Sequence, residues 1–218
     1  MHLVIISGAT RPRGRSNTAK IIDAFQKGYK EGGNTVEVWY LSDRKQWAGA
    51  AAAFAEQENI LIALPLYVEN IPGSLLEFLS CLSPKKEAGT RLAFLIQGGF
   101  PEGSQSRCCE RYLETLPGQL GCEYGGTLIK GDMFGLGMTD EKSRKKMLEP
   151  FVEMGRYFAD HGIFDKEKAY SFAAPEYMPK SQVRLFRLIG HFVQRIFMGR
   201  LAKQMGCKEA LDAKPYEC

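Results

Sequence analysis

Short apolar runs, separated by longer segments of mixed polarity, dominate the pattern of this 218-residue chain. The runs at residues 3–6, 59–64 and 91–96 are almost wholly apolar, which is typical of strands buried on both faces of a sheet. Residues 35–41 alternate and are rich in β-branched and aromatic side chains, which also indicates a strand. Residues 124–131 complete the set as a fifth predicted strand.

The segments between the strands are predicted to be helices. In the first of them, Ile21, Ile22 and Phe25 recur at helical spacing. The expected helices lie at residues 19–29, 47–58, 74–82, 103–120 and 139–162. Thr139 or Asp140 would serve as the N-cap of the last one. Strands that alternate with helices imply a parallel sheet with right-handed crossovers.

Composition narrows the class of protein. Hydrophobic residues make up 44% of the chain, which is ample for a packed core. The apolar runs stay below the ~18 residues that a membrane span requires, and the N-terminal run is too short for a signal peptide. The six cysteines are scattered and form no C-x-x-C pair. We therefore expect a cytoplasmic protein without a bound metal or iron–sulfur cluster.

The net charge of +4 conceals an uneven distribution along the chain. Residues 178–208 contain no Asp or Glu but hold seven of the 29 Lys and Arg residues, which leaves 22 basic against 25 acidic residues elsewhere. Along residues 182–205, Arg184, Arg187 and Arg195 fall on one side of a predicted helix. The apolar residues on its other side are Leu185, Ile189, Phe192, Val193, Ile196 and Phe197.

Three arrangements of this amphipathic tail remain open from the sequence. It could pack on its own domain or on a partner subunit, because apolar stripes on helices mostly belong to a core. It could instead make a peripheral contact through residues 178–208, with an anionic membrane surface or an acidic partner.

The candidate chemistry begins where the first predicted strand ends. The chain breaks at Ser7 and Gly8 into a loop of small, hydroxyl and basic residues, and a helix follows. The first backbone N–H groups of a helix have no partner within it and lie at the positive end of its dipole, so this junction suits an anion. Further donors and charges in the loop are Arg11, Arg13, Arg15, Ser16, Asn17 and Thr18. The loop has neither the G-x-G-x-x-G nor the G-K-[ST] nucleotide motif.

Two further unusual loops follow the third and fourth predicted strands. In the earlier one, Tyr67 could stack on a planar ligand, while Pro65 and Pro72 fix the course of the chain. In the later one, Gly98 and Gly99 would let the backbone approach a ligand closely. Ligands of open parallel sheets bind beyond the carboxyl ends of the strands, so the three loops are expected to meet.

These motifs resemble those of the flavodoxin-like NADPH-dependent FMN reductases and the related iron–sulfur flavoproteins. In that family a Ser- or Thr-rich loop with an Arg and a final Ser-x-Thr grips the FMN phosphate, which Ser16 and Thr18 match here. The segment from Pro65 to Pro72 is similar to the family's P-x-Y-x-x-x-x-P loop, which lies against the flavin ring. The resemblance covers about residues 1–165. Because residues 42–58 lack the family's cysteine cluster, no iron–sulfur cluster is expected.

The resemblance implies an α/β, flavodoxin-like three-layer sandwich: a five-stranded parallel sheet in the order 2-1-3-4-5, with a C-terminal helical extension. Residues 1–165 would form the FMN-binding domain, and residues 166–218 a basic, amphipathic helical extension. The implied cofactor-binding residues are Ser7, Thr10, Arg11, Ser16, Asn17, Thr18, Pro65, Leu66, Tyr67, Val68, Glu69, Asn70, Gln97, Gly98 and Gly99.

The activity implied by the resemblance is that of an FMN-dependent NAD(P)H oxidoreductase. Hydride would pass from reduced nicotinamide through FMN to a quinone, a nitro compound or a similar small acceptor. The alternative is a non-enzymatic electron carrier or a flavin-binding regulator. No catalytic side chain is assigned, because the cofactor carries out hydride chemistry without a protein acid or base. A homodimer is also implied, and the apolar loop around Phe134 and Leu136 would suit its interface.

Overall fold

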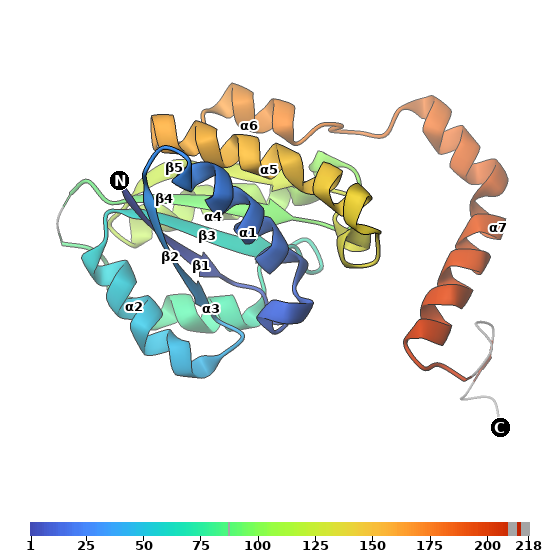
Figure 1. Cartoon of the computed structure of the whole chain (residues 1–218), viewed down its shortest axis with the longest axis horizontal. Helices are drawn as coiled ribbons and strands as arrows, with labels where there is room; N and C mark the ends of the chain where they lie inside the picture. The colour runs from blue at the N-terminus through green and yellow to red at the C-terminus, as the bar shows by residue number, and fades with distance from the viewer. Residues whose placement is uncertain (87, 209–212, 215–218) are drawn as a thin grey trace. The chain divides into compact units, whose positions relative to one another are not determined.

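The computed structural model describes residues 1–86, 88–208, 213 and 214, so residues 209–212 and 215–218 of the expected extension lie outside the described part. The contacts divide the chain into two units, Met1–Tyr177 and Met178–Cys218. Each unit is described by itself (Figure 1).

A five-stranded sheet forms the centre of the first unit. Its strands are β1 (His2–Ser7), β2 (Thr35–Tyr40), β3 (Asn59–Pro65), β4 (Arg91–Gln97) and β5 (Glu123–Lys130). All four pairings are parallel, and the order across the sheet is β2-β1-β3-β4-β5. The predicted flavodoxin-like sandwich is therefore confirmed.

Helices and short 3-10 turns connect the strands. The helices of the first unit are α1 (Asn17–Lys30), α2 (Trp47–Glu56), α3 (Gly73–Ser80), α4 (Arg107–Gln119), α5 (Glu141–His161) and α6 (Lys166–Phe172). The 3-10 turns are η1 (Arg13–Arg15), η2 (Arg44–Gln46), η3 (Gly103–Ser106) and η4 (Phe134–Gly137). The N-cap of α5 is Asp140, whose carboxylate accepts from the Ser143 N–H at 3.0 Å. This bond lowers the pKa of Asp140.

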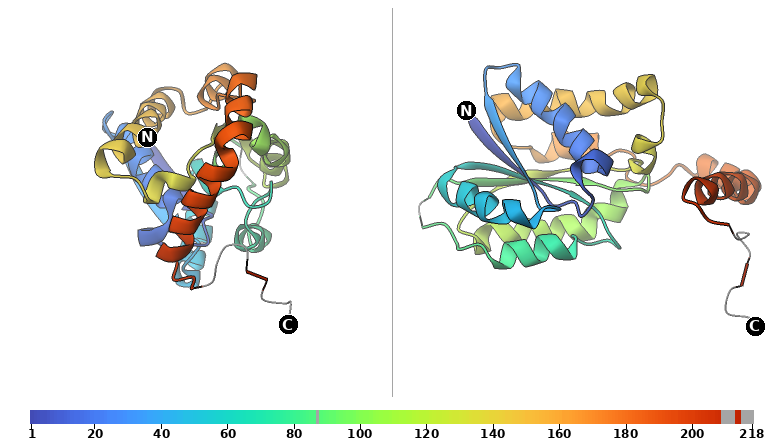
Figure 2. Two further views of the ribbon diagram at one scale, coloured as in Figure 1. Left: turned by 90° about the vertical axis from the view of Figure 1, so that its right-hand side faces the viewer. Right: turned by 60° about the horizontal axis from the view of Figure 1, so that its bottom comes forward.

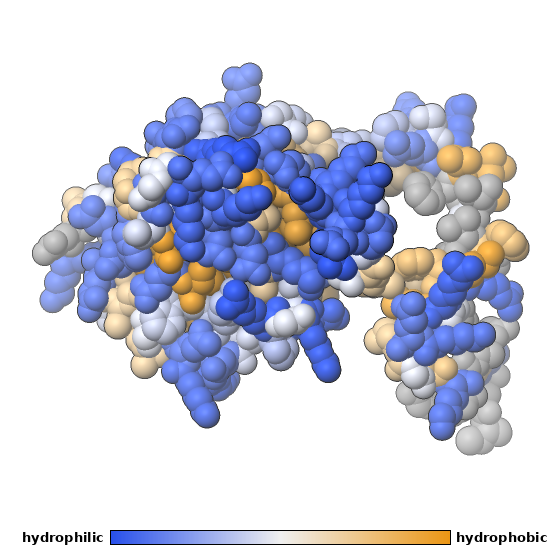
Figure 3. All heavy atoms as spheres, in the orientation of Figure 1, coloured by the Kyte–Doolittle hydropathy of each residue, from blue (hydrophilic) through white to orange (hydrophobic). Residues whose placement is uncertain are grey.

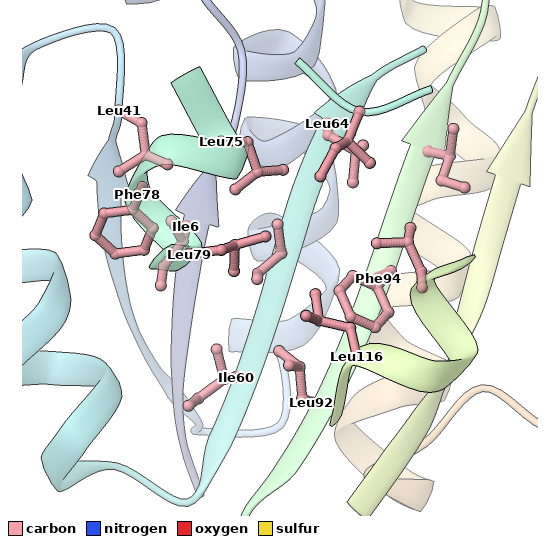
Figure 4. Close-up of a cluster of buried hydrophobic side chains, with 14 of the residues drawn as sticks. Ile6, Leu41, Ile60, Leu64, Leu75, Phe78, Leu79, Leu92, Phe94 and Leu116 are labelled. Carbon is pink, nitrogen blue, oxygen red and sulfur yellow. The ribbon is translucent and has the colours of Figure 1, made fainter. Parts of the chain in front are cut away.

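Both faces of the sheet are buried, which explains why its inner strands read as continuous apolar runs. Along β1, Val4 and Ile6 point to the core under α2, α3 and α4, whereas Leu3 and Ile5 point to the core under α1 and α5. Figure 4 shows the first of these cores, where Phe78 of α3 packs over the strands. Figure 2 shows the two helical layers on opposite sides of the sheet.

Helices α1 and α5 touch backbone to backbone. A Cβ atom added at Gly28 would lie 1.9 Å from the carbonyl oxygen of Val152, and one added at Gly155 would lie 2.1 Å from that of Phe25. Two glycines on facing helices thus permit the close crossing that holds α1 against the sheet. The position of α1 matters because its N-terminus lies beside the end of β1.

The first unit extends past residue 165, the boundary expected from the resemblance. Helix α6 packs on β5, and the Gly103 N–H donates to the Pro175 carbonyl at 2.9 Å. The guanidinium of Arg107 also contacts the carboxylate of Glu176 at 2.7 Å, and both side chains are largely buried. These contacts attach the segment after α6 to the beginning of α4.

The second unit consists mainly of α7 (Lys180–Gln204), which agrees with the helix predicted over residues 182–205. Among the helices of the described residues, none is both long and apolar enough to cross a membrane.

Candidate functional site

The loop after β1 forms a turn that leads directly into α1. Gly8 continues the sheet by donating its N–H to the Ala63 carbonyl at 2.8 Å, and the chain then turns through η1. The hydroxyl of Ser16 caps α1 by accepting from the Ala19 N–H at 3.2 Å. The N-terminus of α1 therefore follows directly after the turn at the end of β1, which is the arrangement in which anion sites form.

Ser7 carries a buried hydroxyl that fits a ligand at this place. Its side chain lies at the last position of β1 and is 1% exposed. Its Oγ has no hydrogen-bond partner among the described residues. A buried polar atom of this kind is costly unless a ligand or water satisfies it. Together with the start of α1, this hydroxyl fits a phosphate monoester such as that of FMN.

The three arginines of the loop are placed differently. The guanidinium of Arg13 contacts the carboxylate of Asp23 in α1 at 3.4 Å and lies 5.3 Å from the centre of the Tyr40 ring at the end of β2. Arg11 and Arg15 are exposed. Arg11, the cation predicted for a bound phosphate, is thus accessible, as is Arg15, whereas Arg13 is already paired within its own unit.

The loop after β3 contains a strained two-residue hairpin. Tyr67 and Asn70 exchange both backbone hydrogen bonds, at 3.0 and 3.1 Å. The two residues between them have positive φ angles, 49° at Val68 and 60° at Glu69. Such a turn normally takes Asn and Gly, and a β-branched residue at positive φ is rare. Strain of this kind is concentrated at functional sites, which is consistent with the predicted ring-binding role of Tyr67, Val68, Glu69 and Asn70.

Replacing Val68 by asparagine should stabilise the protein. Val68 is 99% exposed, so the substitution sacrifices little packing. Asparagine tolerates the left-handed conformation, so the free energy of unfolding should rise by about 1 kcal/mol. Chemical denaturation would measure this change, with Val68→Ile as the control, because isoleucine keeps the branched side chain and should leave stability unchanged. A loss of stability in Val68→Asn would contradict the strained turn.

Hydrogen bonds bring the three predicted loops together. The hydroxyl of Thr10 lies 3.4 Å from that of Tyr67, which links the first loop to the second. The Gln97 side-chain amide donates to the Thr18 hydroxyl at 3.3 Å, which links the end of β4 to the first turn of α1. The Leu66 N–H donates to the Gln97 carbonyl at 2.8 Å.

The remaining predicted residues lie at the same edge of the sheet. Pro65 is the last residue of β3, and Gly98 directly follows β4. Gly98 is buried and Gly99 is exposed. The residues predicted on all three loops thus share one edge.

A fourth loop, after β5, completes the arrangement, although no site residue was assigned to it from the sequence. The Met133 N–H donates to the Gly98 carbonyl at 2.9 Å. The side-chain amide of Asn17 donates to the carbonyls of Met133 and Phe134 at 2.9 and 3.3 Å. Asn17 therefore positions this loop through its side chain, and its backbone N–H is the group that remains suited to a phosphate.

The expected dimer contact through this loop needs a correction. Leu136 is 0% exposed and belongs to the core of its own chain beneath α1 and α5, so it cannot reach a partner subunit. Phe134 is 51% exposed. A Cβ atom at Gly99 would lie 3.5 Å from that of Phe134, so the ring is attached beside the Gly-Gly loop. With Tyr67 and Phe100, it gives this edge three exposed aromatic side chains.

A separate cavity of about 500 Å³ lies away from these loops. It runs along the outer edge of β5 between α4 and α6, and its lining includes Arg107, Glu110, Tyr124, Lys166 and Tyr170. Burial raises the pKa of Tyr124 to about 12. None of the predicted cofactor-binding residues lines this cavity. We assign the candidate site to the loops, because their buried hydroxyl and helix terminus supply anion-binding chemistry.

Within the described residues, no group of three His, Cys, Asp or Glu could hold a metal ion.

Comparison with known proteins gives matches at the level of structure. No protein-family model and no curated protein matches the chain. An FMN-dependent NADH-azoreductase from Bacillus anthracis, solved in complex with FMN, is 16% identical, with a TM-score of 0.55 over 73% of this chain and 100% of its own. An NAD(P)H:quinone oxidoreductase from Methanothermobacter marburgensis is 17% identical, with a TM-score of 0.55 over 76% of this chain and 99% of its own.

A third structure, an NADH:FMN oxidoreductase in its apo form, is 17% identical, with a TM-score of 0.55 over 80% of this chain and 96% of its own. The chain has the flavodoxin-like fold. At these identities the likeness establishes the fold, and the activity must be argued from the site.

Proposed function

We propose that the chain is an FMN-dependent NAD(P)H oxidoreductase that acts on a small-molecule acceptor. The observation that carries this proposal is the meeting of the first and second loops, those after β1 and β3, at the carboxyl edge of the sheet through Thr10 and Tyr67. This edge, at the switch point beside β1, is where the fold places ligands. The three similar structures, named as oxidoreductases that use NADH, NAD(P)H or FMN, support the same assignment.

The chain's own residues would bind and orient the cofactor. The backbone at the start of α1, the hydroxyls of Ser7 and Ser16 and the charge of Arg11 would hold the phosphate. Tyr67 and the strained hairpin would lie along the ring, and Gly98 and Gly99 would allow the backbone to approach its polar edge. FMN bound there would accept hydride from reduced nicotinamide and pass the electrons to a quinone, a nitro compound or a similar acceptor.

The proposal also covers the location of the protein in the cell, its subunit contact and the exclusion of water from the flavin ring. We infer a cytoplasmic homodimer with the exposed Phe134, rather than Leu136, near the subunit contact. The side chains of the site would exclude water from one face of the ring, and no protein acid or base is required.

Anaerobic mixing of the FMN-loaded protein with NADPH, and separately with NADH, tests the activity. We expect the flavin absorbance to bleach with at least one of them, faster than for free FMN at the same concentration, and to return when a quinone is added. Bleaching at the rate of free FMN would contradict the proposed oxidoreductase. Such a protein would instead match the alternative, an electron carrier reduced by a partner protein.

A further inference from the structure

The second unit, taken by itself, is organised around a helix with two unlike sides. With successive residues 100° apart, Leu185, Leu188, Phe192 and Ile196 of α7 fall within a sector of about 80°. Within this unit the apolar side is accessible: Leu188 is 84% exposed and Phe192 is 71% exposed. The side chains of Ile189 and Val193, which the sequence assigns to the same side, lie outside the described set.

A strip of basic residues, the basic side of α7, runs next to the apolar side. With the same 100° between successive residues, a second sector of about 80° holds Lys180, Arg184, Arg187 and Arg195. No Asp or Glu occurs between residues 178 and 208. A helix on the surface of a globular domain usually mixes both signs of charge, so a helix whose charged residues are all basic points to an anionic partner.

We propose that α7 docks on the surface of an anionic lipid bilayer. The helix would lie in the plane of the headgroups, with Leu185, Leu188 and Phe192 inserted at the boundary of the acyl chains. The basic side would contact the lipid phosphates. Figure 3 shows both hydrophobic and hydrophilic residues on the visible face of this helix.

Charge complementarity favours a bilayer over an acidic protein. A bilayer offers an even layer of negative headgroups directly above an apolar interior, and α7 presents a basic strip parallel to an apolar strip over several turns. A protein partner would be expected to meet the helix with charges of both signs and a shaped pocket.

The composition of α7 also limits how it would bind. No described helix is suited to spanning a membrane, so the contact would be peripheral. Arg200 and Lys203 fall on the apolar side near the C-terminal end of the helix. The inserted stretch would therefore end at about Gly199, which places the contact in about the first five to six turns of the helix.

Cosedimentation of the full-length protein with lipid vesicles tests the proposal. We expect the protein to sediment with vesicles of phosphatidylcholine mixed with phosphatidylglycerol, and to remain in solution with phosphatidylcholine alone. Raising the salt from 0.1 to 1 M shortens the Debye length from about 10 to about 3 Å, so most of the binding should be lost. Equal sedimentation with both kinds of vesicle, or with neither, would overturn the proposal.

Matched charge reversals locate the contact on the helix. Arg184→Glu together with Arg187→Glu should weaken binding to the anionic vesicles at least tenfold. The control pair is Lys145→Glu with Lys146→Glu, which changes the net charge equally on the exposed side of α5 and should change binding less than twofold. Equal losses in the two pairs would indicate attraction by net charge alone and would refute docking through α7.

The apolar side is tested by Leu188→Ser together with Phe192→Ser. We expect this pair also to weaken vesicle binding at least tenfold while the basic side is unchanged. Unaltered binding would mean that the helix does not insert, which would contradict the proposed orientation. Thermal unfolding of each variant would verify that the first unit is still folded.

Discussion

Gly28→Ala should lower the free energy of unfolding by about 3 kcal/mol, one of the largest effects expected of a single methyl group in this protein. The new Cβ would lie 1.9 Å from the carbonyl oxygen of Val152, and backbone cannot move aside as a flexible side chain can. Helices α1 and α5 would have to separate, which would open the core around Phe25 and Phe158. Urea denaturation would measure the loss.

Gly118→Ala provides a matched control for this prediction. Gly118 also lies within a helix, and a Cβ atom there would meet nothing within 4 Å. Alanine is the better helix former, so this variant should be unchanged or more stable by up to about 1 kcal/mol. If both variants lost the same free energy, the close crossing of α1 and α5 would not be what makes Gly28 necessary.

Arg11→Ala should weaken FMN binding by a factor of about 10 to 100, because a lost charge-assisted contact costs about 1.5–3 kcal/mol. Ser16→Gly should weaken it in the same direction by removing the hydroxyl from the phosphate loop. Glycine is preferred to alanine in this second variant, because it also serves as an N-cap and costs only a few tenths of a kcal/mol there. Fluorescence titration would measure each affinity.

Two comparisons test whether the loss of FMN affinity in Arg11→Ala comes from the contact with the phosphate. Riboflavin has the same ring without the phosphate, so its affinity should be the same for the parent protein and for Arg11→Ala. Arg13→Ala removes the same type of side chain from the same loop, but Arg13 is paired with Asp23 and should change FMN affinity less than threefold. Equal losses for FMN and riboflavin would place Arg11 at the ring rather than at the phosphate.

Much of the fold could be predicted from local patterns. The inner strands of a parallel sheet are covered on both sides, so β1, β3 and β4 appear in the sequence as apolar runs whatever the details of packing. The ends of those strands then identify which loops share an edge. Ser7, Tyr67 and Gly98 could be grouped from sequence for this reason, although they are far apart along the chain.

The remaining features of the fold and of the candidate site depend on tertiary contacts that no local sequence pattern encodes. Leu136 is as apolar as an interface residue would be, and only the packing of η4 beneath α1 and α5 reveals that it is internal. Asn17 looked like a phosphate donor, but its amide is directed to the carbonyls of Met133 and Phe134. The positive φ angles at Val68 and Glu69 could not be expected from these residue types. Likewise, the attachment of Glu176 to Arg107 depends on tertiary structure.

The central claim is that the loops at the carboxyl edge of the sheet form an FMN site. Its most direct test is titration of the purified full-length protein with FMN, followed by flavin fluorescence. The account predicts saturable quenching with one FMN bound per chain, and binding markedly tighter than that of riboflavin, because Ser7, Ser16 and the start of α1 would hold the phosphate. Absence of quenching, or equal affinity for FMN and riboflavin, would contradict it.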